Sequence, residues 1–225
     1  MRPGDSCICK YTRPIQTQTR FVILMHPKEY KKEKIGTGRM THLQLYNSEI
    51  IVGVDFTENQ RVNELLTQEN TRPLLLYPGK ESFNLSMRGL SDTTTFLGDN
   101  PIIFLLDGTW SCAKKMLRLS KNLQRLRRVS FDNTITSQFV IKQQPNSLCL
   151  STIESVYTVL NLLIDKEIER CDTEGFLIPF EKMIAYQIEC FLNPNNNHYR
   201  PAVNREVTLK DKYQDDSKRS IIYEQ

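Results

Sequence analysis

The chain has 225 residues, of which 39% are hydrophobic and 25% are charged, and its net charge is +4. Such a chain is expected to form one globular domain with a substantial core, and this modest net charge does not by itself indicate a nucleic-acid binder. No apolar run approaches the roughly 20 residues that a membrane-spanning helix needs, and no signal-peptide pattern is present, so we expect no membrane association and a cytoplasmic protein.

The N-terminal segment, residues 1–19, is polar and contains the only close pair of cysteines, Cys7 and Cys9. A Cys-x-Cys pair supplies two thiolate ligands, whereas a structural zinc site needs four ligands. The other four of the six cysteines are scattered singly, which does not fit a disulfide framework. We therefore expect reduced thiols and no metal site.

An apolar run at residues 20–25 predicts a first buried strand, with His26 at its carboxyl end. Pro27 favours an extended backbone at His26, which would hold the imidazole at the strand end. A lone histidine more often has a structural role, but the carboxyl ends of strands are where open α/β sheets bind ligands. Both roles stay open for His26.

Residues 28–34 are predicted to form a charged, exposed turn that leads to Gly36-Thr37-Gly38-Arg39. Two glycines permit positive φ and let backbone amides converge on an anion, while Arg39 can pair with a phosphate or carboxylate. The string matches neither a Walker loop nor a dinucleotide-binding fingerprint. A plain tight turn before a helical pattern at residues 40–45 is the alternative.

A second apolar strand is predicted at residues 49–56, and a short helix follows it. Thr57 is expected to cap this helix. The inner face of the helix carries three apolar residues, Val62, Leu65 and Leu66.

A third strand is predicted at residues 72–77, ending in Tyr77 and Pro78. If this strand and the one before Asp107 are parallel neighbours, Tyr77 and Pro78 lie in the same crevice as Asp107. The alternative is an ordinary turn that ends the strand.

The central feature is an apolar run at residues 101–106 that leads directly into Asp107-Gly108-Thr109-Trp110. A helix after a buried strand presents free N–H groups and a positive dipole end to a crevice. Asp107 can act there as an acceptor or base, Gly108 lets the backbone approach a ligand, and Trp110 can stack or pack. In the alternative interpretation, Asp107 and Thr109 cap the helix and Trp110 belongs to the core.

A strongly basic stretch follows, because residues 111–128 contain seven basic residues and no acidic one. Spacings of three and four place five of them on one face of a predicted helix: Lys114, Arg118, Lys121, Arg125 and Arg128. A charge run is usually a solvated face, but solvated helices commonly mix signs. We therefore expect this face to contact RNA phosphates.

The rest of the chain predicts a short strand at residues 128–131, two helices and a tail. Ser151 and Glu154 match a capping box, in which the two side chains satisfy reciprocal backbone N–H groups, and this explains both residues by itself. The last helix is predicted at residues 179–192, and residues 193–225 form a polar tail.

These motifs, in this order, resemble the DTW-domain family over roughly residues 7–192. The Asp-x-Thr-Trp string at residues 107–110 is the signature of that family. Further matching segments are Cys7-Ile-Cys9, His26-Pro27-Lys28-Glu29, Gly36-Thr37-Gly38-Arg39, Asn47-Ser48, Tyr77-Pro78, Gln144-Pro145 and Leu150-Ser151-Thr152-Ile153-Glu154. One short motif is weak evidence, whereas so many in order are strong evidence.

The resemblance implies a tRNA-uridine aminocarboxypropyltransferase that moves the 3-amino-3-carboxypropyl group of S-adenosylmethionine to uridine N3 and releases methylthioadenosine. Asp107 is then expected to act as the general base or as the group that orients the uridine, and no catalytic metal is needed. The expected cofactor-binding residues are Tyr77, Pro78, Asp107, Gly108, Thr109, Trp110, Leu150, Ser151, Thr152 and Glu154. The expected RNA-binding residues are His26, Arg39, Lys114, Arg118, Lys121 and Arg125.

The alternation of strands and helices predicts one α/β domain at residues 20–192, with a mostly parallel sheet flanked by helices. The resemblance adds a SPOUT-like trefoil knot between Asp107 and Ser151, which no sequence pattern shows. Many members also have a Cys-x-x-Cys before the Arg-Pro seen here as Arg2-Pro3. This sequence begins just after that place, so we do not expect an intact zinc knuckle.

Two other functions stay open at this point: a SPOUT-like RNA methyltransferase and a non-catalytic RNA-binding module. The nature of the modified nucleoside separates the first from the transferase, and binding of S-adenosylmethionine separates the second. The sequence does not distinguish a monomer from a homodimer, nor tRNA from ribosomal RNA as the substrate.

Overall fold

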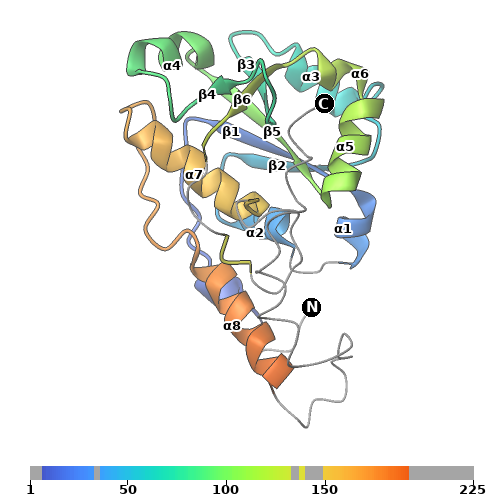
Figure 1. The fold of residues 1–225 in the computed structure, drawn as a ribbon, viewed down its shortest axis with the longest axis vertical. Helices are drawn as coiled ribbons and strands as arrows, with labels where there is room; N and C mark the ends of the chain where they lie inside the picture. The colour runs from blue at the N-terminus through green and yellow to red at the C-terminus, as the bar shows by residue number, and fades with distance from the viewer. Residues whose placement is uncertain (1–6, 33–35, 133–136, 140–148, 193–225) are drawn as a thin grey trace.

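A computed structural model describes residues 7–32, 36–132, 137–139 and 149–192 of the chain. These residues form a single α/β domain in which a six-stranded sheet lies between helices (Figure 1). The strand order is β2-β1-β5-β3-β6-β4, and every neighbouring pair runs parallel. The prediction of an α/β domain with a mostly parallel sheet is therefore confirmed.

The strands are β1 (Arg20–Met25), β2 (Ser48–Val52), β3 (Arg72–Leu76), β4 (Phe83–Asn84), β5 (Pro101–Asp107) and β6 (Arg127–Ser130). The helices are η2 (Cys9–Tyr11), α1 (Pro27–Lys32), α2 (Thr37–Leu43), α3 (Gln60–Leu66), α4 (Leu90–Leu97), α5 (Trp110–Leu119), α6 (Lys121–Gln124), α7 (Thr152–Ile164) and α8 (Ile178–Leu192). The sequence predicted neither β4 nor α4.

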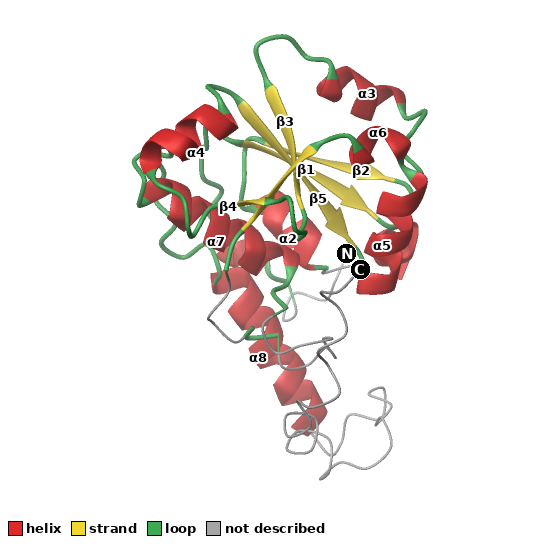
Figure 2. Ribbon diagram, turned by 45° about the horizontal axis from the view of Figure 1, so that its top comes forward, coloured by secondary structure: helices red, strands yellow, loops and turns green. Residues whose placement is uncertain are grey.

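The central strands are apolar along their length because helices cover both faces of the sheet (Figure 2). Along β1, Phe21 and Ile23 pack with α2, α7 and α8, whereas Val22 and Leu24 pack with α3, α5 and α6. The same alternation continues along β5. Side chains on a strand point to opposite faces in turn, so a strand buried on both sides must be apolar throughout.

The connections place the switch point of the sheet between β1 and β5. These two strands are neighbours, with Met25 opposite Asp107, but α2 after β1 and α5 after β5 cover opposite faces of the sheet. In open α/β sheets, the point at which the helices change faces leaves a ligand crevice outside the strand ends. Asp107 therefore lies where the fold favours a binding site.

The predicted continuous basic helix is wrong, because the helix ends at Leu119 and Arg128 belongs to β6. The loop after β2 causes this break. The Phe56 N–H donates to the buried Ser120 hydroxyl at 3.0 Å, and the Lys121 N–H donates to the Thr57 hydroxyl at 3.1 Å. Ser120 adopts ψ of 89°, outside the helical region, so α6 starts as a separate helix.

The predicted cap of α3 is also wrong. Asn59 caps this helix, since its side-chain oxygen accepts a hydrogen bond from the Val62 N–H at 3.0 Å. Thr57 instead hydrogen-bonds to Asp55 and bridges to the α5–α6 junction. Thr57, which the local sequence pattern favoured as the cap, is therefore engaged in tertiary contacts instead.

The glycine string forms the start of a helix rather than a loop, because residues 37–39 belong to the first turn of α2. Gly36 is the N-cap, and neither Gly36 nor Gly38 has a positive φ. The segment after His26 is helix α1 rather than the expected turn. The capping box at Ser151 and Glu154 is confirmed at the start of α7.

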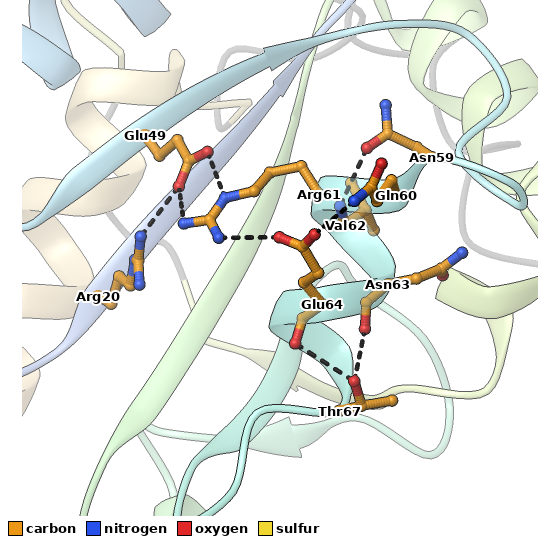
Figure 3. A network of polar contacts seen from close by, with 9 residues as sticks. All are labelled: Arg20, Glu49, Asn59, Gln60, Arg61, Val62, Asn63, Glu64 and Thr67. Atoms are coloured by element: carbon orange, nitrogen blue, oxygen red, sulfur yellow. Dashed lines mark hydrogen bonds and ion pairs between the residues drawn. The ribbon is translucent and has the colours of Figure 1, made fainter.

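The amino ends of β1 and β2 are joined to α3 by a network of charges (Figure 3). Glu49 accepts from Arg20 and Arg61, each at 2.9 Å, and Arg61 also contacts Glu64 at 3.2 Å. Hydrogen bonding by Arg61, aided by Arg20, lowers the pKa of the Glu49 carboxyl below its ordinary value. These charges neutralise one another.

Several expectations fall on residues outside the described part of the chain. The segment between Asp107 and Ser151 includes residues 133–136 and 140–148, so the knot stays a prediction, as does the tail at residues 193–225. Among the described residues, no group of three or more His, Cys, Asp or Glu side chains could hold a metal ion. None of the described helices is long and apolar enough to cross a bilayer.

Candidate active site

A cavity of about 1500 Å³ lies over the carboxyl ends of β3, β5 and β6. Helices α1, α2, α7 and α8 also contribute to its wall. The structure brings together nine of the ten predicted cofactor-binding residues on this wall: Tyr77, Pro78, Asp107, Gly108, Thr109, Trp110, Leu150, Ser151 and Thr152. The wall formed by the described residues does not include Glu154, His26 or Arg39.

Asp107 is the last residue of β5 and only 6% of its surface is exposed. Its carbonyl accepts the His26 N–H at 2.8 Å, which holds the end of β5 against the end of β1. Its carboxylate oxygen Oδ1 accepts the Thr152 hydroxyl at 2.5 Å. A hydroxyl from the first turn of α7 therefore orients the carboxylate, and backbone pairing fixes its position.

Gly38 lets the backbone of α2 come against the Asp107 carboxylate. A Cβ atom at Gly38 would lie 2.6 Å from Asp107 Oδ2, 2.7 Å from Cγ and 2.9 Å from Oδ1. These separations are far below van der Waals contact, so only glycine fits beside this carboxylate without displacing it. The glycine that the sequence suggested for an anion loop instead allows close approach to Asp107.

Trp110 begins α5, directly after Thr109, whose hydroxyl caps the helix by accepting the Cys112 N–H at 3.3 Å. The indole packs edge-on against Tyr77, with ring centroids 6.5 Å apart. The Arg128 guanidinium lies 5.6 Å from the centre of the Tyr77 ring. Burial raises the pKa of the Tyr77 phenol, so this side chain stays neutral and acts as an aromatic wall.

Glu154 lies outside the cavity wall and hydrogen-bonds to residues next to it. Its carboxylate accepts the N–H and hydroxyl of Ser151, the Ser137 hydroxyl and the Gln138 N–H, all within 3.1 Å. These donors occupy the buried carboxylate and tie residues 137–138 to the start of α7. Glu154 therefore positions the cavity wall next to Thr152.

His26 is buried, with 7% of its surface exposed. Its Nδ1 accepts the Lys28 N–H at 3.1 Å, so in the neutral ring the proton lies on Nε2. Burial, followed by the positive charge of Lys28, lowers the pKa of His26 below its ordinary value. The ring is thus neutral at pH 7, and the Cβ atom of His26 lies beside Gly108.

Arg39 points away from the cavity toward α1. Its guanidinium lies 4.2 Å from the centre of the Tyr30 ring and donates to the Tyr30 carbonyl at 2.9 Å. Its buried Nε has no hydrogen-bond partner in the described structure. These contacts fix the end of α1 to the start of α2.

The four remaining predicted RNA-binding residues are all exposed: Lys114, Arg118, Lys121 and Arg125. In the part of the chain that the structure describes, ion pairs form only among Arg20, Glu49, Arg61 and Glu64. The cations of α5 and α6 consequently have no carboxylate partner there. α5 starts at the cavity with Trp110, so this cationic face begins next to the cavity.

A family model for the DTW domain matches residues 1–188. The chain belongs to the DTW domain family. It is 30% identical to a mouse (Mus musculus) protein over 195 residues, 30% to a Macaca fascicularis protein over 196, and 28% to a Drosophila melanogaster protein over 214. All three are named tRNA-uridine aminocarboxypropyltransferase 2. No solved structure gives a significant match.

The matches cover 84% of this chain for the mouse and macaque relatives and 89% for the fly relative. They cover 62% of the mouse and macaque proteins and 81% of the fly protein. This DTW domain therefore spans about 62% of the length of the two mammalian relatives.

Sequence reasoning missed one side of the cavity in this DTW domain. Its wall there includes residues around the short strand β4: Lys80, Ser82, Asn84, Met87 and Arg88, together with Ser130 at the end of β6 and Asp132 after it. A strand of two residues has too few positions to show alternation, so the pattern gave no signal. Glu29 of α1 was missed because its segment was read as an exposed turn.

Proposed function

We propose that this protein is a tRNA-uridine aminocarboxypropyltransferase, with S-adenosylmethionine as donor and uridine N3 as acceptor. Membership of the DTW domain family and the shared name of its relatives support this activity. The observation that carries the proposal is the placement of Asp107, buried at the end of β5 beside the sheet's switch point, on the wall of a large cavity over the ends of β3, β5 and β6.

We propose that the cavity takes a donor and an acceptor base together. Its volume of about 1500 Å³ exceeds the range of roughly 300–1000 Å³ typical of small-ligand pockets. In the described structure its wall carries three acidic side chains, Glu29, Asp107 and Asp132, and two basic ones, Lys80 and Arg88. An excess of one carboxylate suits a ligand with a sulfonium charge.

Asp107 is proposed to accept or orient the N3 proton of the uridine during transfer. When bound, S-adenosylmethionine supplies a sulfonium that makes its attached carbons electrophilic. The protein then has to place the correct carbon in line with N3, and positioning of this kind contributes much of the rate. The Thr152 hydroxyl and the Gly38 backbone keep the carboxylate in one orientation for this step.

The cationic face of α5 and α6 is proposed to bind the tRNA backbone. At 1.5 Å per residue, the ten residues of α5 extend about 15 Å from Trp110 at the cavity. A phosphate chain along this face would deliver one nucleotide to the cavity, where the base leaves its stack to reach the donor. Trp110 and Tyr77 offer aromatic surface at that entrance.

The direct test incubates the purified protein with unmodified tRNA and S-adenosylmethionine and analyses the digested nucleosides by mass spectrometry. We expect a uridine that carries the added aminocarboxypropyl group, together with one equivalent of methylthioadenosine. A methylated uridine with S-adenosylhomocysteine would establish a methyltransferase instead. Unmodified tRNA, with no donor binding by calorimetry, would contradict both activities.

A further inference from the structure

A row of side chains crosses three strands on the wall of the cavity. β4 and β6 pair with Asn84 opposite Ser130, and β3 and β6 pair with Leu76 opposite Val129. Tyr77 and Ser130, one residue further on, therefore lie side by side, with Asn84 on the other side of Ser130. Residues in register point to the same face of a sheet, and all three line the cavity.

Asp132 extends this row and is held in a defined orientation. Asn84 Nδ2 donates to Asp132 Oδ1 at 2.8 Å, and the Asp132 N–H donates to the Ser86 hydroxyl at 3.0 Å. The Asn84 side-chain oxygen is itself fixed, because it accepts the Ser86 N–H at 2.9 Å. Asn84 engages one of the two carboxylate oxygens and leaves Oδ2 able to accept from a ligand.

Ser130 provides a second acceptor beside Asp132. Ser82 donates its hydroxyl proton to the Gly79 carbonyl at 2.6 Å and lies 2.8 Å from the Ser130 hydroxyl. A hydroxyl has a single proton, so Ser130 must be the donor to Ser82. The lone pairs of Ser130 Oγ are then available to a ligand, as is Asp132 Oδ2.

We infer that this row is a nucleoside subsite, in which Asp132 and Ser130 accept hydrogen bonds from ribose hydroxyls beside the Tyr77 ring. Carboxylates at strand ends of open α/β sheets hold ribose in this manner. Two acceptors side by side suit a vicinal diol, which a free adenosine carries, whereas an internal RNA nucleotide offers only its 2′-hydroxyl. The favoured ligand is therefore the adenosine part of the donor.

Asp107 and Asp132 line the same cavity, which is compatible with this assignment, and the assignment rests on the proposed function. β5 and β6 are separated by one strand, β3, so their ends lie roughly 10 Å apart at about 4.8 Å per strand. A donor bound with its ribose at Asp132 would extend its sulfonium toward Asp107. The two ends of one ligand would then meet the two carboxylates of the cavity.

The test measures binding of 5′-methylthioadenosine to the full chain by calorimetry, for the wild type and for Asp132→Asn. Loss of hydrogen bonds to a charged acceptor should weaken binding roughly 10- to 100-fold. The 2′,3′-dideoxy analogue should bind the wild type weakly and lose nothing further in Asp132→Asn. Asp99→Asn, an exposed acid beyond the cavity wall, is the matched control and should bind like the wild type.

A second arm measures tRNA affinity and the affinity of a DNA copy of the same sequence. A loss in Asp132→Asn that is confined to tRNA, with methylthioadenosine binding unchanged, would assign the subsite to an RNA 2′-hydroxyl. Unchanged binding of both ligands, or an equal loss for the dideoxy analogue, would overturn the ribose subsite.

The binding readouts separate this inference from the proposed reaction. A wild type that binds methylthioadenosine through Asp132 but transfers no group contradicts the function alone. A wild type that transfers the group, while Asp132→Asn binds both ligands normally, contradicts the subsite alone. A wild type that binds neither methylthioadenosine nor tRNA contradicts both.

Discussion

Charged side chains are paired with one another at the amino end of the sheet and are exposed near its carboxyl end. At the amino ends of β1 and β2, Glu49 is held between Arg20 and Arg61, and these charges satisfy one another (Figure 3). At the carboxyl ends, the Thr152 hydroxyl and the Gly38 backbone lie against the Asp107 carboxylate, and the neighbouring α5 and α6 cations face solvent. Paired charges stabilise the fold, whereas the exposed cations can bind an anionic ligand.

Asp107→Asn should have the largest effect on transfer. We expect the rate of transfer to fall by roughly 100- to 10,000-fold, the usual contribution of a general base, because the amide cannot accept the N3 proton. Single-turnover transfer to tRNA measures the effect, and calorimetry checks that S-adenosylmethionine still binds. Wild-type transfer by a folded, donor-binding variant would exclude this role for Asp107.

Gly38→Ala should have the next largest effect on transfer. The new Cβ would overlap the Asp107 carboxylate, and a displacement of about 1 Å in a catalytic group can cost roughly 100-fold in rate. Gly89→Ala is the matched control, since a Cβ there meets no atom within 4 Å. Equal transfer rates for the two variants would show that the close approach at Gly38 has no catalytic consequence.

Thr152→Val removes the hydroxyl that orients Asp107 and keeps the shape of the side chain. Hydrogen bonds to charged groups contribute about 1.5–3 kcal/mol, so we expect roughly a 10- to 100-fold loss of transfer. Thr152→Ser retains the donor and should recover most of the rate. If the serine and valine variants lose equal activity, packing rather than the hydroxyl explains the effect.

Arg118→Ala and Arg61→Ala compare an exposed cation with a paired one. Loss of a phosphate contact at Arg118 should weaken tRNA binding and reduce the slope of log affinity against log salt by about 0.7–0.9. Arg61→Ala should leave that slope unchanged and lower the stability of the fold. A salt titration of tRNA binding and a urea unfolding curve for each variant decide the matter.

The smallest expected effect is the pH dependence of the amino-end network. The pKa of Glu49 is lower in the folded protein, chiefly through Arg61, so its stabilisation is present above the ordinary pKa of 4.5 and is lost as pH falls below it. Glu49→Gln should therefore destabilise the protein at pH 7, and this destabilisation should become smaller as pH falls below 4.5. A destabilisation that does not change with pH would exclude a charge effect.

Local sequence patterns predicted the elements whose cause lies in neighbouring residues, such as an apolar run that becomes a buried strand. The apolar run at residues 20–25 is β1 without any change of bounds, and the run before Asp107 is β5. The capping box at Ser151 was visible because both partners lie within four residues. In each case neighbouring residues contain the physical cause.

Long-range contacts explain what the sequence did not show. The helix break at Ser120 depends on Phe56, 64 residues away, and the role of Gly38 depends on the Asp107 side chain. Asp132 acquires its orientation from Asn84, 48 residues away, on a strand too short to predict. The DTW string located the centre of the site, but the partners that orient it became visible only in three dimensions.

The strand order also has a consequence for biosynthesis. β5 lies between β1 and β3, although the ribosome makes it after β1, β2, β3 and β4. A nascent chain that stops before β5 has β1 and β3 without the neighbour that joins them. The strand that unites the two halves of the sheet also ends in Asp107, so the chain gains its central strand and its buried carboxylate together.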